Sequence, residues 1–164
     1  MSVLLSIQSW AQQPPMFAFI PTNLSGVIYG QAQVDGIPAT SNDWIAAFDA
    51  SGVCCGASAL TMNAGTAYIN LVIYGDDFTT PTIDEGMSGN EDFTLKLYQF
   101  STGLYIDYPS NNNTTYLSGW ANTNGTPIPA FSNVNDIYNF LNTSLVTLNL
   151  NITLCENEAA VILS

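Results

Sequence analysis

Residues 71–106 read LVIYGDDFTTPTIDEGMSGNEDFTLKLYQFSTGLYI, and this stretch decides the fold. Leu71–Tyr74 is a short apolar run, and Phe93–Phe100 is rich in apolar and aromatic residues, as strands are. A Ser-Thr-Gly turn leads to a third apolar run, Leu104–Ile106. We therefore expect a hairpin whose first two strands are joined by the acidic loop 75–92, with the other strands laid against it.

Further strand patterns lie on both sides of this stretch. No segment keeps a 3.6-residue apolar period, and Gly, Asn and Pro separate roughly ten short apolar or alternating runs. This pattern predicts an all-β fold: an immunoglobulin-like or jelly-roll-type β-sandwich with short loops and a terminal strand available for exchange. Tyr116–Trp120 is interpreted as a short strand, and Val134–Phe140 as either a helical turn or a strand. The remaining predicted strands are Met16–Ile20, Ser25–Val34, Asp43–Phe48, Val53–Ala59, Thr66–Tyr74 and Leu145–Leu154.

The charge composition excludes several classes of function. Lys96 is the only basic residue of the 164, Arg and His are absent, and the net charge is −12. Binding to nucleic acid or to anionic lipid requires cationic side chains, so neither is expected as a partner. Nucleophile–histidine arrangements and ordinary catalytic zinc sites require His. We expect a protein that is not an enzyme.

The two ends of the chain differ from its middle. Residues 1–13 contain a short apolar run followed by Ser9-Trp10-Ala11, which resembles the end of a secretory signal peptide or an added N-terminal strand. This segment is too short to span a membrane. Residues 14–143 are interpreted as the sandwich domain, and residues 144–164 as a C-terminal strand and tail. We expect export to the cell surface or extracellular space.

The C-terminal strand carries a hypothesis about assembly. Leu145–Leu154 alternates without error and contains no charge. Such a segment either closes its own sandwich or completes the sheet of a second copy by β-strand addition. Repeated head to tail, the second arrangement builds an open homopolymer. The apolar side chains that would form this interface are Val146, Leu148, Leu150, Ile152 and Leu154.

Two patterns resemble a known group of proteins. DWIAAF at 43–48 with GVCCG at 52–56 is similar to D-x-I-G-A-F…G-x-C-x-G, and residues 74–103 are similar to G-D-D-x-x-T-P…G-E…K-x-Y…S-T-G. Both patterns occur in secreted surface-protein β-sandwich domains of Bacteroidetes, many exported by the type IX route. The resemblance covers about residues 14–108; Asn90-Glu91 replaces the usual Gly-Glu, and Cys55 stands where Arg or Ala is frequent. It implies an extracellular sandwich without known catalytic residues.

The acidic loop is a candidate Ca²⁺ site. Carboxylates are hard oxygen ligands, and the loop glycines allow backbone carbonyls to turn inward. The spacing is not that of an EF-hand, and the alternative is a solvated turn whose acids cap the backbone. No other cofactor is expected. The candidate ligands are Asp76, Asp77, Asp84, Glu85, Glu91 and Asp92.

Two further sets of residues are weighed as ligand or catalytic sites. Aromatic rings near Asn-rich loops are candidates for stacking on a polysaccharide: Tyr105, Tyr108, Tyr116 and Trp120. Trp44 is expected in the core. A glycoside hydrolase needs two carboxylates in one cleft, for which Asp43, Asp49 and Asp107 are the only acids near aromatics outside the loop.

Three cysteines complete the set of candidates. In an exported protein an odd number favours one disulfide and one free thiol. Cys54 and Cys55 point to opposite faces of a strand, so that one is expected to be buried, and either could pair with Cys155 of the same or another chain. A strained bridge between Cys54 and Cys55 themselves is the other alternative. Together these features predict a structural subunit of an extracellular filament or surface matrix. The alternative is a carbohydrate-binding or adhesion module.

Overall fold

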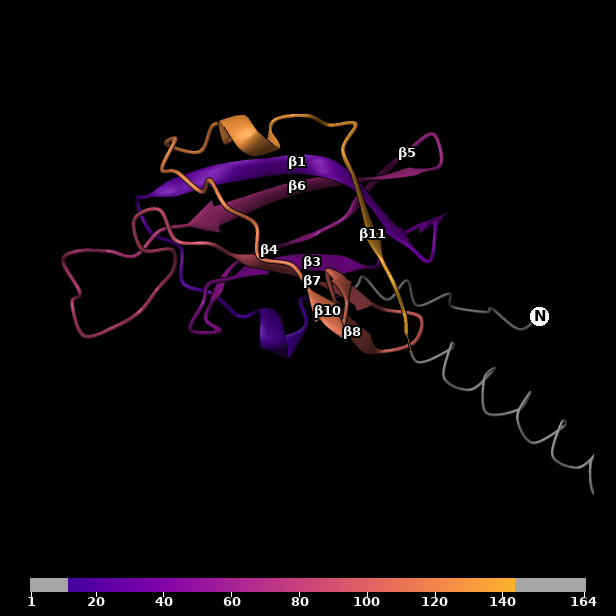
Figure 1. The fold of residues 1–164 in the computed structure, drawn as a ribbon, viewed down its shortest axis with the longest axis horizontal. Helices are drawn as coiled ribbons and strands as arrows, with labels where there is room; N and C mark the ends of the chain where they lie inside the picture. The colour runs from indigo at the N-terminus through magenta and orange to yellow at the C-terminus, as the bar shows by residue number, and fades with distance from the viewer. Residues whose placement is uncertain (1–11, 144–164) are drawn as a thin grey trace, which may run out of the picture.

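The computed structural model describes residues 12–143, in which two β-sheets pack face to face (Figure 1). One sheet has the order β11 (Ile137–Phe140), β1 (Ser25–Val34), β6 (Thr66–Tyr74) and β5 (Thr61–Asn63), with β2 (Ile37–Pro38) also paired to β1. The other has the order β4 (Cys54–Ala59), β3 (Trp44–Phe48), β7 (Thr94–Gln99) and β8 (Leu104–Asp107). The predicted all-β sandwich is confirmed.

Short elements connect the sheets. β9 (Pro109–Ser110) and β10 (Asn113–Thr114) form a two-stranded ribbon, and 3-10 turns occur at η1 (Pro15–Phe17) and η2 (Pro129–Phe131). No helix in residues 12–143 is long and apolar enough to cross a membrane.

The register of the five-stranded sheet follows from the alternation of its strands. β1 and β6 pair antiparallel from Ser25↔Tyr74 to Gln31↔Tyr68, so Ile28 and Leu71 lie opposite each other on the inner face. β1 turns back into β2 through Asp35 and Gly36, which both have positive φ, as a two-residue hairpin turn requires. Residues 37–38 continue this hairpin as the short strand β2.

The core lies between the two inner faces. Large side chains from both sheets are fully buried there, and residues from the 117–131 segment close one end. Burying such side chains contributes about 1.5–3 kcal/mol each, before the entropy of ordering the chain is subtracted. The largest of them are Phe93, Phe140, Ile28, Ile45, Ile69, Leu71, Ile73, Met87, Leu95, Leu97 and Ile106.

A smaller apolar cluster covers the outer face of the four-stranded sheet. Phe17, from η1, is fully buried against Phe48 and Cys54, with Tyr105 at its edge at a ring separation of 5.4 Å. The segment 16–20 was predicted as a strand, and that prediction is wrong. Pro14 and Pro15 lack the N–H groups that a sheet ladder needs, and Phe17 N–H instead bonds to the Pro14 carbonyl at 2.9 Å.

The opening hairpin was also predicted wrongly. β6 and β7 lie in different sheets, so the acidic loop 75–92 crosses from one layer to the other and projects beyond the sheets at the left of Figure 1. An eighteen-residue connection is far longer than the two to five residues of most hairpin loops, and it imposes no pairing. The second half of the prediction holds, because β7 and β8 pair antiparallel across the 100–103 turn.

Three smaller predictions are now decided. Val134–Phe140 contains strand β11, which pairs parallel to β1. Tyr116–Trp120 is not a strand and makes only the isolated bridge Phe93↔Leu117. Trp44 is half-buried on the outer face rather than in the main core. The segment Leu145–Leu154 lies outside the described residues, as does 1–11.

Candidate functional site

The sheet edges are the candidate site, because strand addition requires an edge whose backbone groups are unpaired. The sheet orders place β11 and β5 at the edges of one sheet and β4 and β8 at the edges of the other. β9 contacts both β8 and β11, whereas β4 packs on β6 and continues through Leu60 into β5. The β8 and β11 edges therefore lie on one side of the sandwich, and the β4 and β5 edges on the opposite side.

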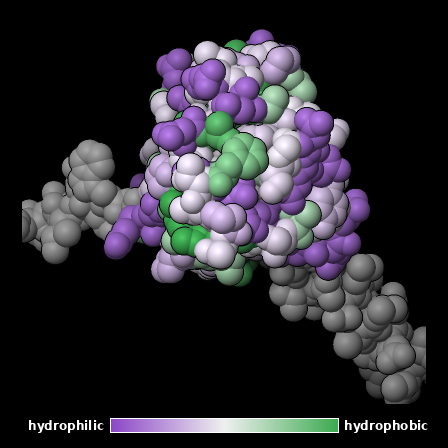
Figure 2. Space-filling view, turned by 90° about the vertical axis from the view of Figure 1, so that its left-hand side faces the viewer, coloured by the Kyte–Doolittle hydropathy of each residue, from purple (hydrophilic) through white to green (hydrophobic). Residues whose placement is uncertain are grey.

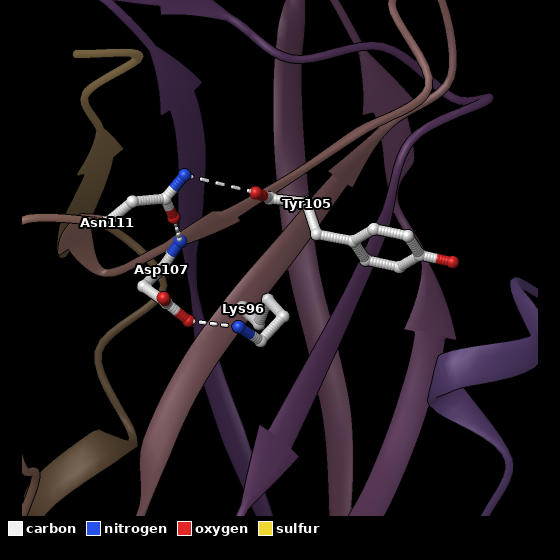
Figure 3. A network of polar contacts seen from close by, with 4 residues as sticks. All are labelled: Lys96, Tyr105, Asp107 and Asn111. Carbon is white, nitrogen blue, oxygen red and sulfur yellow. Dashed lines mark hydrogen bonds and ion pairs between the residues drawn. The ribbon is translucent and has the colours of Figure 1, made fainter. Parts of the chain in front are cut away.

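The β8 edge is occupied by a side chain of the same molecule (Figure 3). The Asn111 Oδ1 accepts a hydrogen bond from the Asp107 N–H at 2.7 Å, and the Asn111 Nδ2 donates to the Tyr105 carbonyl at 3.3 Å. Asn111 thus takes the place of a neighbouring strand. A side chain that fills an edge in this way prevents pairing with another chain.

A charge pair stands beside that blocked edge. Lys96 and Asp107 are cross-strand partners on β7 and β8, and the Lys96 Nζ forms an ion pair with the Asp107 Oδ1 (Figure 3). The ammonium also lies 5.9 Å from the centre of the Phe48 ring. Lys96, the chain's only basic residue, therefore lies on this face of the sheet. A charged side chain beside an edge strand disfavours pairing with another strand.

The β4 edge has none of these protections. It runs for six residues, Cys54–Ala59, with no charge and no Pro, and no strand within residues 12–143 pairs with its outer side. Leu60 N–H bonds to the Asp43 carbonyl, so alternate residues along β4 point their backbone groups toward β3. The backbone groups of Ala57 and Ala59 consequently point outward from the edge.

The inner side of β4 is closed at Gly56, and apolar surface is exposed only farther along, at Met62 of β5. Gly56 and Ser58 face inward, where a Cβ on Gly56 would lie 2.0 Å from the Val72 carbonyl oxygen. Met62 of β5 shares the inner face with its partner Ala67, yet Met62 is 39% exposed while Ala67 is fully buried. The apolar layer thus continues past β4 without a strand to cover it.

Two buried polar atoms beside this edge lack hydrogen-bond partners. They are the Ser58 Oγ and the Trp44 Nε1, both on the paired strands β3 and β4, and the described part of the chain contains no others. An unpaired buried polar group costs about 1–3 kcal/mol. The β4 edge therefore has side-chain groups without hydrogen-bond partners beside it, in addition to its unpaired outer side.

Cys54 and Cys55 begin the same strand, and both are buried. Cys54 lies in the outer cluster beneath η1 and Cys55 in the main core, so the expectation that only one is buried is wrong. The thiols are not bonded to each other. Burial raises the pKa of Cys54 from 9.0 to about 11, and burial also raises the pKa of Cys55. Cys155 lies outside the described residues, so its pairing stays a prediction.

The acidic loop uses its carboxylates as backbone caps. Glu85 is 5% exposed and accepts hydrogen bonds from the Asp77 N–H and the Thr80 hydroxyl, while Glu91 accepts from the N–H groups of Ala50 and Ser88. Asp76 accepts from the Glu85 N–H, Asp77 from the Thr79 N–H and Asp84 from the Ser51 hydroxyl. Asp92 is exposed.

These contacts disperse the predicted calcium ligands. Along residues 12–143 no three acidic or cysteine side chains come together as a metal site would require. The six loop acids do not surround a common point, which favours the alternative of a capped turn. The hydrogen bond from the Thr79 N–H holds the pKa of Asp77 below its usual range.

The carboxylates considered for glycoside hydrolysis serve separate structural contacts. Asp43 is 2% exposed and accepts hydrogen bonds from the Thr40 N–H at 2.7 Å and the Phe100 N–H at 2.9 Å. Asp49, at the other end of β3, accepts from the Val53 N–H and the Ser51 hydroxyl. Asp107 pairs with Lys96. They do not share a cleft.

The four aromatic residues considered for sugar stacking do not form one face. Trp120 is 4% exposed, and its Nε1–H donates to the Ile73 carbonyl, so its ring is not accessible. Tyr105 packs edge-on against Phe17, and Tyr108 packs in the same way against Phe140. Only Tyr116 of the four is exposed, at 60%.

A hollow of about 370 Å³ lies at the base of the acidic loop. Its walls combine apolar and amide side chains, among them Phe78, Met87, Trp120, Asn90 and Asn122. Phe78 is 86% exposed, and Figure 2, which views the end where the loop projects, shows apolar residues exposed among polar ones.

No family model, curated protein or solved structure matches this chain. The resemblance to Bacteroidetes surface domains therefore stays a prediction. Sequence reasoning missed Asn111, Ser58 and Met62, the residues that distinguish a blocked edge from an open one. The available signal was weak: of the described strands longer than two residues, Cys54–Ala59 alone has only small side chains.

Proposed function

We propose that this protein is a structural subunit of an extracellular filament or surface matrix, and that it polymerises by β-strand addition. The observation that carries the proposal is the uncharged edge of β4, unpaired within residues 12–143, in a chain whose sequence also contains the alternating segment Leu145–Leu154. An exposed edge of this kind normally carries a charge, a Pro or a cover, and β8 illustrates such protection in the same sheet.

Composition supports assembly over solution chemistry. The chain holds one cation among 164 residues, and the carboxylates of Asp43 and Asp49 cap backbone N–H groups while Asp107 pairs with Lys96, so these three do not meet in a cleft. A near-absence of Lys also removes most sites for trypsin-like proteases, which suits a protein that persists outside the cell.

The test compares two substitutions of equal charge on opposite faces of the alternating segment. Leu150→Asp places a carboxylate in the apolar stripe, whereas Asn149→Asp places it on the polar face. Burying an unpaired carboxylate costs several kcal/mol, so Leu150→Asp is expected to lower the yield of SDS-resistant polymer at least about a hundredfold. Asn149→Asp is expected to polymerise like the wild type. Equal polymer yields from the two variants would contradict strand addition.

A second candidate function is binding of a neutral saccharide at the hollow beside the acidic loop. Phe78 offers an exposed ring next to the amides of Asn90 and Asn122, the combination of stacking surface and hydrogen-bonding groups that sugars use. Glycan-array binding that disappears with Phe78→Ala, while thermal stability is unchanged, would support this function. Binding that persists in Phe78→Ala would exclude the hollow as the site.

A further inference from the structure

We infer that the β4 edge is the acceptor for the segment Leu145–Leu154 of a second copy, so that donor and acceptor lie on opposite sides of each subunit. This inference rests on the proposed function and adds the location and direction of the contact. It is drawn from the four sheet edges, of which β4 is the longest, carries no charge and has no strand of residues 12–143 paired to its outer side.

The other three edges are poorer acceptors. β8 is filled by Asn111, and β5 is only three residues long. β11 has four residues, and the inner side chains Tyr138 and Phe140 are already buried beneath Tyr108, with ring separations of 5.4 and 5.5 Å. A strand added beside β11 would find its apolar layer already complete.

An added strand at β4 would complete the layer that is missing there. In the pleat of β4 the inner face carries Gly56 and Ser58. The backbone of β6 closes over Gly56, so the apolar surface left to cover lies farther along, at Met62 of β5. The apolar stripe of the donor then faces the same way and covers Met62, while the Thr and Asn residues between face outward. The stripe that fills this layer comprises Val146, Leu148, Leu150, Ile152 and Leu154.

The charge distribution permits this contact. Neither Cys54–Ala59 nor Leu145–Leu154 contains a charged residue, although the chain carries −12 overall. Like charges opposite each other across a strand pair are destabilising, and none arises here. Backbone groups of Ala57 and Ala59 supply the ladder, so that recognition depends on the edge rather than on ionic contacts.

The donor of the same chain starts on the wrong side to fill its own β4 edge. Thr143 follows β11, where the Leu141 N–H bonds to the Pro109 carbonyl. From β11 to β5 the sheet spans three strand spacings, or about 14 Å, and the second sheet lies about 10 Å below. Three residues from Thr143 to Val146 extend at most about 10 Å. The complete stripe can therefore reach the β4 edge only of another molecule.

Opposite placement of donor and acceptor fixes the kind of assembly. A contact between two different surfaces is heterologous, and it extends without limit unless a ring closes. Each added subunit presents a fresh β4 edge on its far side. The geometry therefore gives a head-to-tail chain rather than a symmetric dimer.

The first experiment blocks the acceptor in the full-length protein. Ala59 is exposed and its N–H points outward, so Ala59→Pro removes one ladder donor and places a ring against an incoming strand without disturbing β3. Elongation, followed by light scattering and negative-stain microscopy, is expected to slow at least about tenfold. Ala59→Val keeps the N–H and adds similar bulk, and it is expected to elongate at the wild-type rate. Far-UV circular dichroism verifies that both variants are folded.

The second experiment mixes two blocked variants. Ala59→Pro retains its donor and Leu150→Asp retains its acceptor, so each variant alone elongates at least about tenfold more slowly than the wild type. An equimolar mixture is expected to give one-to-one heterodimers and nothing longer, measured by light scattering coupled to size-exclusion chromatography. This result follows only if donor and acceptor are separate surfaces.

The outcomes separate the inference from the proposed function. If the wild type polymerises and a folded Ala59→Pro polymerises equally fast, the assignment of β4 is wrong while strand-addition assembly stands. A mixture that forms long polymers overturns the assignment in the same way. If the wild type forms no polymer under any condition in which it is folded, the proposed function fails and this inference fails with it.

Discussion

The Asn111 side chain accepts a hydrogen bond from the Asp107 N–H at 2.7 Å and returns one to the Tyr105 carbonyl two residues away. One amide side chain thus satisfies two outward backbone groups of β8, the Asp107 N–H and the Tyr105 carbonyl. On the opposite edge of the same sheet, Ala57 and Ala59 have no such partner among residues 12–143. The four-stranded sheet is therefore closed to strand pairing on one side and open on the other.

Removing this amide is expected to open the β8 edge. Asn111→Ala deletes two hydrogen bonds at a partly solvated site, which lowers the free energy of unfolding by about 1–2 kcal/mol. Because the edge becomes unpaired, side-by-side association of subunits should also increase. Urea titration and size-exclusion chromatography measure the two effects. Asn135→Ala, in an exposed turn, serves as the control and should change neither.

Two neighbouring substitutions on β4 are expected to have opposite effects. A Cβ at Gly56 would lie 2.0 Å from the Val72 carbonyl oxygen, so Gly56→Ala forces the sheets apart and should destabilise by about 3 kcal/mol or more. Ser58→Ala removes a buried hydroxyl that has no partner and should be neutral or stabilising by up to about 1 kcal/mol. Thermal unfolding of the monomer compares them. A large loss of stability in Ser58→Ala would show that the hydroxyl is bonded.

Most strands were predictable from sequence, whereas pairing was predictable across the short turn between β7 and β8 and not across the long acidic loop. Ser25–Val34 and Thr66–Tyr74 match β1 and β6 because alternation reports burial on one face. The pairing of β6 with β7 failed because an eighteen-residue loop allows its two strands to lie in different sheets. The strand expected at residues 16–20 failed because Pro14 and Pro15 favour a turn over a ladder.

The candidate site was less predictable than the fold, because it depends on contacts between distant residues. Trp120 is buried where its indole donates to Ile73, 47 positions earlier in the chain. The acids of the loop look like a ligand set in sequence, yet Glu91 caps Ala50, 41 positions earlier. The type of a residue determines which groups its side chain can bind. The fold determines which of those groups lies close enough to be its partner.

The buried carboxylate of Asp43 is expected to be a strong stabilising contact. It joins the loop before β3 to the turn after β7 through the N–H groups of Thr40 and Phe100. Asp43→Asn turns one acceptor into a donor that faces an N–H group, which should cost about 2–3 kcal/mol. Asp92→Asn, at an exposed position, removes the same charge and should change stability by less than about 0.5 kcal/mol. Urea unfolding at pH 7 measures both, and equal effects would rule out the capping role.

The acidic loop is expected to be stable without a divalent cation. Its carboxylates already accept hydrogen bonds from backbone N–H groups and hydroxyls, for example Glu85 from Asp77 and Thr80. Excess EDTA should therefore leave the melting temperature unchanged, and millimolar CaCl₂ should add no more than MgCl₂ does at equal ionic strength. Glu85→Gln should lower the melting temperature in either buffer, because the buried side chain at position 85 then binds Asp77 and Thr80 more weakly. A calcium-specific rise in melting temperature would instead show that the loop rearranges around a bound ion.

Alkaline pH should destabilise the protein through the thiols at the start of β4. Burial raises the pKa of Cys54 from 9.0 to about 11 and also raises that of Cys55, so the folded state retains protons that the unfolded state loses. The sign follows from linkage: stability is constant below about pH 8 and falls as pH rises through 9 toward 11. The phenol of Tyr138, whose pKa is raised to about 12, adds to this loss only above pH 10. Urea unfolding between pH 7.5 and pH 10 should show the decline in the wild type and a flatter profile in Cys54→Ala/Cys55→Ala. Identical slopes in the two proteins would mean that the thiols do not cause the decline.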